Sequence, residues 1–152
     1  MVSEDKGHGH DGKYSAWRRH YFKDTLEIDG LFCTDIDWIE WRKGKPVAII
    51  ECRRAIGGLK TAQAAINHVK GHNNGFQLEV LAKLAHDLKI DAYIVGIEDD
   101  ANSNDYSNAR FVVEKIEPPT PRPDGRLDVT KIKTVPMNPM DLNGYVKFIV
   151  DL

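Results

Sequence analysis

Three acidic residues and an arginine interrupt two otherwise apolar stretches of the sequence. Asp35 and Asp37 belong to the first stretch, and Glu51 and Arg53 belong to the second. Burying a charge costs free energy, so charged side chains in strands of this kind indicate a purpose. Carboxylates are the oxygen ligands that Mg²⁺ takes in proteins, and a guanidinium can donate two hydrogen bonds to a phosphate. These residues therefore predict a divalent-metal site, at which water and phosphate oxygens would complete the coordination of the ion. The alternative is a salt bridge between Asp35 and Arg53 at the end of a sheet, with Asp37 as a solvated strand end.

Residues 33–54, which contain these four side chains, predict a β-hairpin. Apolar residues fill both arms, and the turn-prone sequence Lys-Gly-Lys-Pro lies between them at residues 43–46. A hairpin centred on Gly44 gives four cross-strand pairs, namely Trp41 with Val47, Ile39 with Ile49, Asp37 with Glu51 and Asp35 with Arg53. All of them share one face, because side chains repeat with period two along a strand. Two facing carboxylates repel each other unless a divalent cation lies between them.

The residues of this hairpin resemble the core motif of the PD-(D/E)XK nucleases. That motif is an Asp, a spacer, and then Glu-x-Lys at the end of an apolar strand. Here Asp37 and the run Glu51-Cys52-Arg53 are similar to it, with arginine in the position of the lysine. In its size and its Arg-containing N-terminal segment the chain looks most like the archaeal-type Holliday junction resolvases. The resemblance implies an α/β fold with a restriction-endonuclease-like core, in which helices flank a central mixed β-sheet.

The resemblance also implies roles for individual residues. Asp37 and Glu51 would coordinate Mg²⁺ or Mn²⁺, the backbone carbonyl of Cys52 would be a further ligand, and Asp35 is another candidate ligand. Many family members carry an acidic residue on the first helix, and here Glu27 or Asp35 would have to replace it. Arg53 cannot act as a base, because the pKa of arginine lies above ~12, so we expect it to donate hydrogen bonds to the phosphate in the transition state.

Basic residues near the predicted site are candidates for DNA binding. They are Arg18, Arg19 and Lys23 on a helix predicted at residues 14–24, and Arg54 and Lys60 after the hairpin. A solvated helix face and a plain connecting loop are the alternatives. The net charge of −2 argues against a protein that coats nucleic acid through overall charge. Residues 1–70 contain 12 Lys and Arg against 10 Asp and Glu, whereas residues 71–152 contain 9 against 13, so we expect the DNA-binding surface in the first half.

The function implied by the resemblance is that of a magnesium-dependent endodeoxyribonuclease that resolves four-way junctions in DNA recombination and repair. No segment has a recognisable base-contacting motif, which favours recognition of DNA structure over DNA sequence. A four-way junction needs paired cuts, so this function predicts a homodimer with two sites. The alternatives are another nuclease of the superfamily, such as a repair endonuclease or an exonuclease, and a non-catalytic DNA-binding module.

The remaining sequence predicts one nuclease domain at residues 14–152, behind a disordered polar tail at residues 1–13. Its core spans residues 14–116, a proline-rich connection spans 117–125, and a C-terminal extension spans 126–152. We expect five further elements: helices at 61–71 and 76–89, a strand at 91–97 parallel to the second hairpin arm, an outer strand at 109–116, and a short strand at 129–135. A last helix begins at Asn138-Pro139, and its apolar side chains either cover the core or make a dimer contact.

Two other features bear on where the protein works. No apolar run approaches the ~20 residues of a membrane span, and the N-terminus lacks the apolar stretch of a signal peptide, so we expect a cytoplasmic protein without membrane contact. Cys33 and Cys52 are the two cysteines, and in a reducing compartment they are expected to be packing residues rather than a disulfide. Gln77, near the start of the predicted helix at 76–89, resembles an accessory glutamine of the family, with ordinary helix-surface polarity as the alternative.

Overall fold

The computed structural model describes residues 27, 36–99 and 106–152, and the chain divides into two compact units, Met1–Asp37 and Trp38–Leu152. In the first unit only residues 27, 36 and 37 are described. Several predictions therefore lie outside the described residues, namely the tail at 1–13, the helix at 14–24 with Arg18, Arg19 and Lys23, and the positions of Cys33 and Asp35. The single-domain boundary at residue 14 stays a prediction for the same reason.

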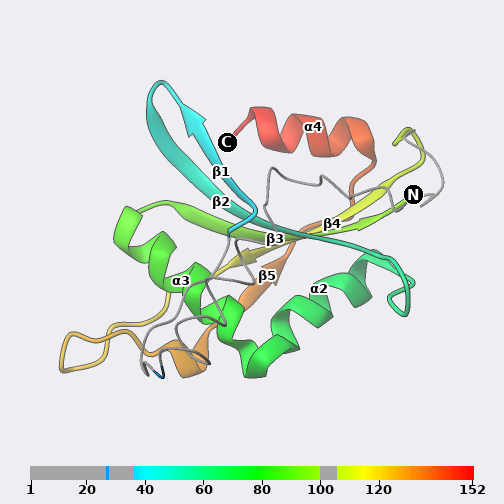
Figure 1. Cartoon of the computed structure of the whole chain (residues 1–152). Helices are drawn as coiled ribbons and strands as arrows, with labels where there is room; N and C mark the ends of the chain where they lie inside the picture. Colours follow the sequence, from blue (N-terminus) through cyan, green and yellow to red (C-terminus); the bar gives the residue numbers. More distant parts are fainter. Residues whose placement is uncertain (1–26, 28–35, 100–105) are drawn as a thin grey trace. The chain divides into compact units, whose positions relative to one another are not determined.

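The second unit is an α/β structure built on a five-stranded mixed sheet with strand order β1-β2-β3-β4-β5 (Figure 1). Strands β1 (Trp38–Arg42) and β2 (Lys45–Arg54) form the predicted hairpin. Between them lies a two-residue turn, in which Lys43 and Gly44 have φ values of 50° and 76°. Positive φ at both positions is typical of the type I′ turn, whose twist matches that of the flanking strands.

The predicted register of this hairpin is correct for the pairs far from the turn and wrong for the pairs next to the turn. Ile39 faces Ile49 as expected, and the same register pairs Trp38 with Ile50 and Glu40 with Ala48. Trp41, however, pairs with Pro46 and not with Val47. The two-residue turn closes on the pair Arg42–Lys45, so the pairing near the turn is shifted by one residue. An irregularity between Glu40 and Trp41 absorbs the shift and leaves Val47 as the extra residue of a β-bulge.

The next elements follow the predictions closely. Helix α2 (Ala62–Gly71) begins where the Thr61 side chain accepts a hydrogen bond from the Ala64 amide at 3.0 Å. A 3₁₀ turn, η3 (His72–Gly75), leads to helix α3 (Phe76–Leu88) and then to strand β3 (Asp91–Glu98). As predicted, β3 pairs with β2 in parallel, from Ala48–Asp91 to Arg54–Ile97. Helices α2 and α3 lie together on one face of the sheet (Figure 1).

Strand β4 (Arg110–Ile116) is not the outer strand that its sequence predicts. It pairs antiparallel with β3, and strand β5 (Thr134–Pro136) pairs antiparallel with it on the other side. The chain thus returns to the sheet after the proline-rich connection, and β4 lies between β3 and β5 with most of its residues buried. Only the end of the strand predicted at 129–135 forms, because residues Val129–Lys131 make a 3₁₀ turn, η4.

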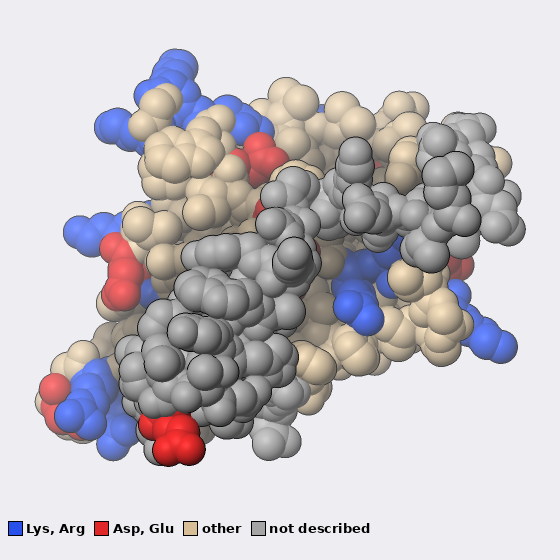
Figure 2. All heavy atoms as spheres, in the orientation of Figure 1, with Lys and Arg blue, Asp and Glu red and all other residues tan. Residues whose placement is uncertain are grey.

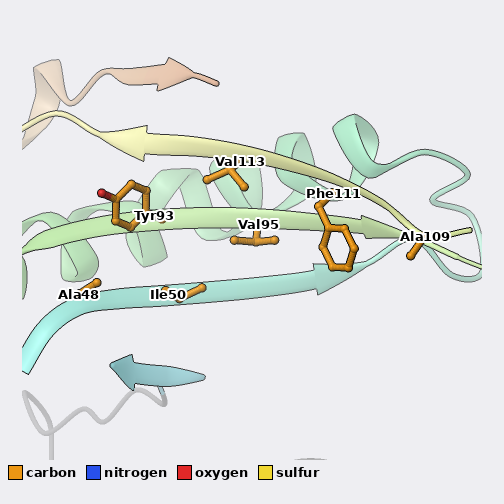
Figure 3. Packing of buried hydrophobic residues seen from close by; sticks show 7 residues of the cluster. All are labelled: Ala48, Ile50, Tyr93, Val95, Ala109, Phe111 and Val113. Atoms are coloured by element: carbon orange, nitrogen blue, oxygen red, sulfur yellow. The ribbon is translucent and has the colours of Figure 1, made fainter. Parts of the chain in front are cut away.

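Helix α4 (Leu142–Val150) covers the face of the sheet opposite to α2 and α3 (Figure 1). It begins at Leu142 rather than at Asn138, because Asp141 is the capping residue and accepts a hydrogen bond from the Gly144 amide at 2.7 Å. Beneath the helix lies the core cluster of Figure 3, which consists of Ala48, Ile50, Tyr93, Val95, Ala109, Phe111 and Val113. Tyr145 stacks on Phe111 with ring centroids 4.3 Å apart. Of the two alternatives for the apolar side chains of this helix, covering the core and making a dimer contact, α4 shows the first.

None of the helices in the described part of the chain combines the length and the apolar character that are needed to cross a membrane.

Candidate functional site

Glu51 and Arg53 lie on the same face of the sheet, as the period of the strand predicts. Ala48 and Ile50 of β2 belong to the cluster under α4. The alternate residues of β2, including Glu51 and Arg53, therefore lie on the face that carries α2 and α3. In β3 their partners are Ile94 and Gly96, and Glu51 and Arg53 both lie in the carboxyl half of β2. The candidate site is thus located on this face, near the end of β2.

The two charged side chains differ in exposure. Glu51 is half-buried, and its Oε2 atom is buried, whereas Arg53 is exposed. A buried carboxylate oxygen is suited to a hard cation, and an exposed guanidinium is available to a phosphate that approaches from solvent. The pair thus offers a metal ligand and a phosphate donor two residues apart on one strand.

The other predicted ligands are not brought to Glu51 by the described structure. Asp37 is half-buried but is the last residue of the first unit, so the predicted Asp37–Glu51 pair stays a prediction. Asp35 lies outside the described residues, and Glu27 is exposed with a positive φ of 53°. Within residues 27, 36–99 and 106–152, no group of three His, Cys, Asp or Glu residues is placed to hold a metal ion.

The two predicted DNA-binding residues after the hairpin have different surroundings. Arg54 donates from Nε and Nη2 to Oδ1 and Oδ2 of Asp99, at 2.8 and 2.7 Å. The Asp99 side chain is only 1% exposed, so this fork joins the end of β2 to the residue after β3. Lys60 is exposed in the connection between β2 and α2. Of the two, Lys60 has its charge in solvent, while the Arg54 guanidinium is occupied by a structural partner.

Cys52 and Gln77, the remaining candidates, lie on opposite sides of the sheet. Cys52 is a half-buried thiol that packs against the core under α4. Burial raises the pKa of Tyr145, and so does the neighbouring Cys52, whose sulfur accepts a hydrogen bond from the Tyr145 hydroxyl. Gln77 is half-buried on α3. The predicted roles of the Cys52 carbonyl and of Gln77 are not tested by these positions.

A buried carboxylate that the sequence analysis missed lies two strands away from Glu51. Glu114 of β4 is 5% exposed and pairs with Ile94, the residue that also faces Glu51. Its Oε2 accepts from Lys70 Nζ at 3.0 Å, and its Oε1 accepts from Gln63 Nε2 at 3.4 Å. Two strand spacings of ~4.8 Å separate the backbones of Glu51 and Glu114, and the Glu114 carboxylate already has Lys70 as its ion-pair partner. Two features of the sequence could have indicated this carboxylate. Glu114 is an acidic residue inside an apolar strand, and its partners Gln63 and Lys70 are seven residues apart, which places them on the same face of a helix.

Comparisons of the chain with protein-family models, with curated proteins and with solved structures found no match.

Proposed function

We propose that the chain is a metal-dependent endodeoxyribonuclease with a restriction-endonuclease-like core. The observation that carries the proposal is the placement of Glu51 and Arg53 on one face of β2, in the part of the strand that pairs in parallel with β3. The Trp38–Ile50 pair also has the register from which the Asp37–Glu51 prediction was made. A metal ligand and a phosphate donor at this spacing resemble the Glu-x-Lys element of the PD-(D/E)XK nucleases.

In this proposal each residue of the chain has a distinct task. Glu51 and Asp37 hold Mg²⁺ or Mn²⁺ through carboxylate oxygens, and the Cys52 carbonyl and Asp35 are further candidate ligands. The ion, when bound, supplies Lewis acidity towards the scissile phosphate. Arg53 donates hydrogen bonds to the phosphate as negative charge builds, and it remains protonated throughout because of its high pKa. Lys60 neutralises a neighbouring phosphate of the DNA backbone.

The proposed substrate is a four-way DNA junction that is cut by a homodimer. A symmetric pair of sites matches the paired cuts that junction resolution requires. The described helices are occupied in covering the sheet, which supports recognition of DNA structure rather than of a base sequence.

The experiment that tests this proposal compares substrates and metals. The purified full chain is incubated with a synthetic four-way junction, a nicked duplex and a linear duplex of the same sequence, each with Mg²⁺, with Mn²⁺ and with chelator. We expect paired, metal-dependent cuts in the junction and an intact linear duplex. Equal cutting of all three substrates would indicate a repair endonuclease or an exonuclease instead. Binding without cutting in either metal would indicate a non-catalytic DNA-binding module.

The arginine at the motif position offers a second test in the same assay. Arg53→Lys restores the Glu-x-Lys sequence, so the variant should retain cutting, whereas Arg53→Ala should lose most of it because no cationic donor remains.

A further inference from the structure

The tip of the β1–β2 hairpin presents an indole among basic side chains. Trp41 is 57% exposed, and Lys43 and Lys45 are exposed on the turn beside it. Figure 2 shows Lys and Arg side chains gathered at this end of the hairpin. In the described part of the chain no carboxylate forms an ion pair with either lysine. The tip, defined here as residues 41–46, thus combines a flat aromatic surface with two positive charges in solvent.

Arg42, the third basic residue of the tip, is used to fix its geometry. Its Nη1 donates to Glu40 Oε2 at 3.0 Å and to the Trp41 carbonyl at 2.8 Å. Its Nη2 donates to the Ile149 carbonyl of α4 at 2.6 Å. The type I′ turn and these three hydrogen bonds restrain the tip. A rigid platform loses little conformational entropy when a ligand binds to it.

The indole points to the face that carries the candidate site. Arg42 contacts α4, so Trp41, the preceding residue of the strand, lies on the opposite face. Glu51 and Arg53 lie on that same face. Trp41 pairs with Pro46, and Glu51 is five residues further along β2. At about 3.3 Å per residue the two positions are ~17 Å apart, which corresponds to about five nucleotides of a strand within duplex DNA.

We infer that Trp41, Lys43 and Lys45 form a second DNA contact, in which the indole stacks on an unpaired base and the lysines neutralise the adjoining phosphates. The inference rests on the proposed function for DNA as the ligand and adds that the substrate offers an unstacked base about five nucleotides from the cut. Aromatic side chains beside positive charge are the usual platform for unpaired bases. A second copy of the chain fits the tip less well than DNA does, because a symmetric contact between two tips would bring their lysines together and the positive charges would repel.

The test measures binding without metal, so that cleavage does not enter the result. A labelled four-way junction, a labelled 20-nucleotide single strand and a labelled linear duplex are titrated with the full chain in chelator, at several salt concentrations. Trp41→Ala should weaken binding to the single strand and the junction by about fivefold or more, with an unchanged salt dependence, because a stacking contact releases no counterions. Lys43→Ala with Lys45→Ala should lower the slope of log affinity against log salt by about 1.8 on the junction and the linear duplex, and by about 1.4 on the single strand.

Matched variants separate stacking from other causes. Trp41→Phe should retain most of the affinity, whereas Trp41→Leu, which keeps the apolar surface but has no aromatic face, should lose as much as Trp41→Ala. Lys131→Ala with Lys133→Ala removes the same charge from exposed positions near β5, at the other edge of the sheet, and should leave a larger slope than the tip variant.

Four outcomes decide the inference. Wild-type-like binding by the tip variants of a chain that binds and cuts DNA would overturn the inference and leave the proposed function intact. A change in sedimentation from dimer to monomer in Trp41→Ala, with unchanged DNA affinity, would overturn it in favour of a contact between copies. No DNA binding by the wild-type chain would overturn it as well. Weakened binding by the tip variants of a chain that never cuts would support the inference and contradict the nuclease.

Discussion

Replacing Gly96 by alanine should move the start of α2 away from the sheet. A Cβ atom at residue 96 would lie 2.1 Å from the Ala62 carbonyl oxygen, 2.9 Å from the Ala62 carbonyl carbon and 3.1 Å from Ile66 Cγ1. The nearest obstacle is backbone, so no side-chain rotation relieves it. Helix and strand must separate by about 1 Å, which disturbs a close-packed interface and the 2.9 Å hydrogen bond from the Ala62 amide to Glu98 Oε2.

The expected loss of stability follows from this geometry. Overpacking a core costs ~1–3 kcal/mol, and a backbone clash with loss of a helix-end hydrogen bond places Gly96→Ala near 3 kcal/mol. In a chain of this length that corresponds to a fall of ~6–12 °C in Tm. Circular dichroism during heating, together with a urea titration, measures both quantities.

Gly71→Ala is the matched control for this variant. Gly71 is the last residue of α2, has no atom within 4 Å of an added Cβ and does not have a positive φ. Alanine there should be neutral or stabilise the chain by up to ~1 kcal/mol through helix propensity. A Tm of Gly96→Ala equal to that of the wild type would refute the close approach of α2 to β3.

Three further variants test the buried polar groups. Lys70→Met should destabilise the chain by ~2 kcal/mol, because it removes the cation from the buried Glu114 carboxylate. In a double-mutant cycle this loss of stability should be smaller when Glu114 is also replaced by Met. Arg54→Ala should cost ~3 kcal/mol in urea unfolding, since Asp99 is then buried without its bidentate partner, and a loss below ~1 kcal/mol would contradict that role. The pKa of Tyr145 is raised in the folded state, so the unfolded chain releases this proton first once the pH passes the ordinary value of 10.0. Stability should therefore fall above that pH by up to ~1.4 kcal/mol per pH unit, and Tyr145→Phe should have a flatter profile between pH 10 and about 11.

The parts of the fold that local sequence controls could be predicted. Apolar arms around Lys43-Gly44 specify a hairpin, and Thr61 followed by an amphipathic run specifies α2. The parallel pairing of β2 and β3 follows from a hairpin arm, two helices and then an apolar strand. The face shared by Glu51 and Arg53 follows from the period of the strand alone.

What could not be predicted depends on contacts between distant residues or on one-residue details of the turn. The pair Trp41–Pro46 follows from a two-residue turn, whereas a turn centred on Gly44 gives Trp41–Val47. Strand β5 has three residues and exists because β4 offers it hydrogen-bonding partners. The ion pairs Arg54–Asp99 and Lys70–Glu114 join residues more than forty positions apart, so no local sequence pattern predicts them.

The central claim is that the Glu51 carboxylate holds the metal with which a DNA strand is cut. The direct measurement compares Glu51→Gln with the wild type on a four-way junction, with cutting assayed in Mg²⁺ and affinity assayed in chelator. Glutamine preserves the size and a hydrogen-bonding oxygen but removes the negative charge that the ion requires. We expect junction affinity within about twofold of the wild type and a loss of cutting of about a thousandfold or more, equivalent to ~4 kcal/mol of transition-state stabilisation. Cutting at the wild-type rate by Glu51→Gln would contradict the claim.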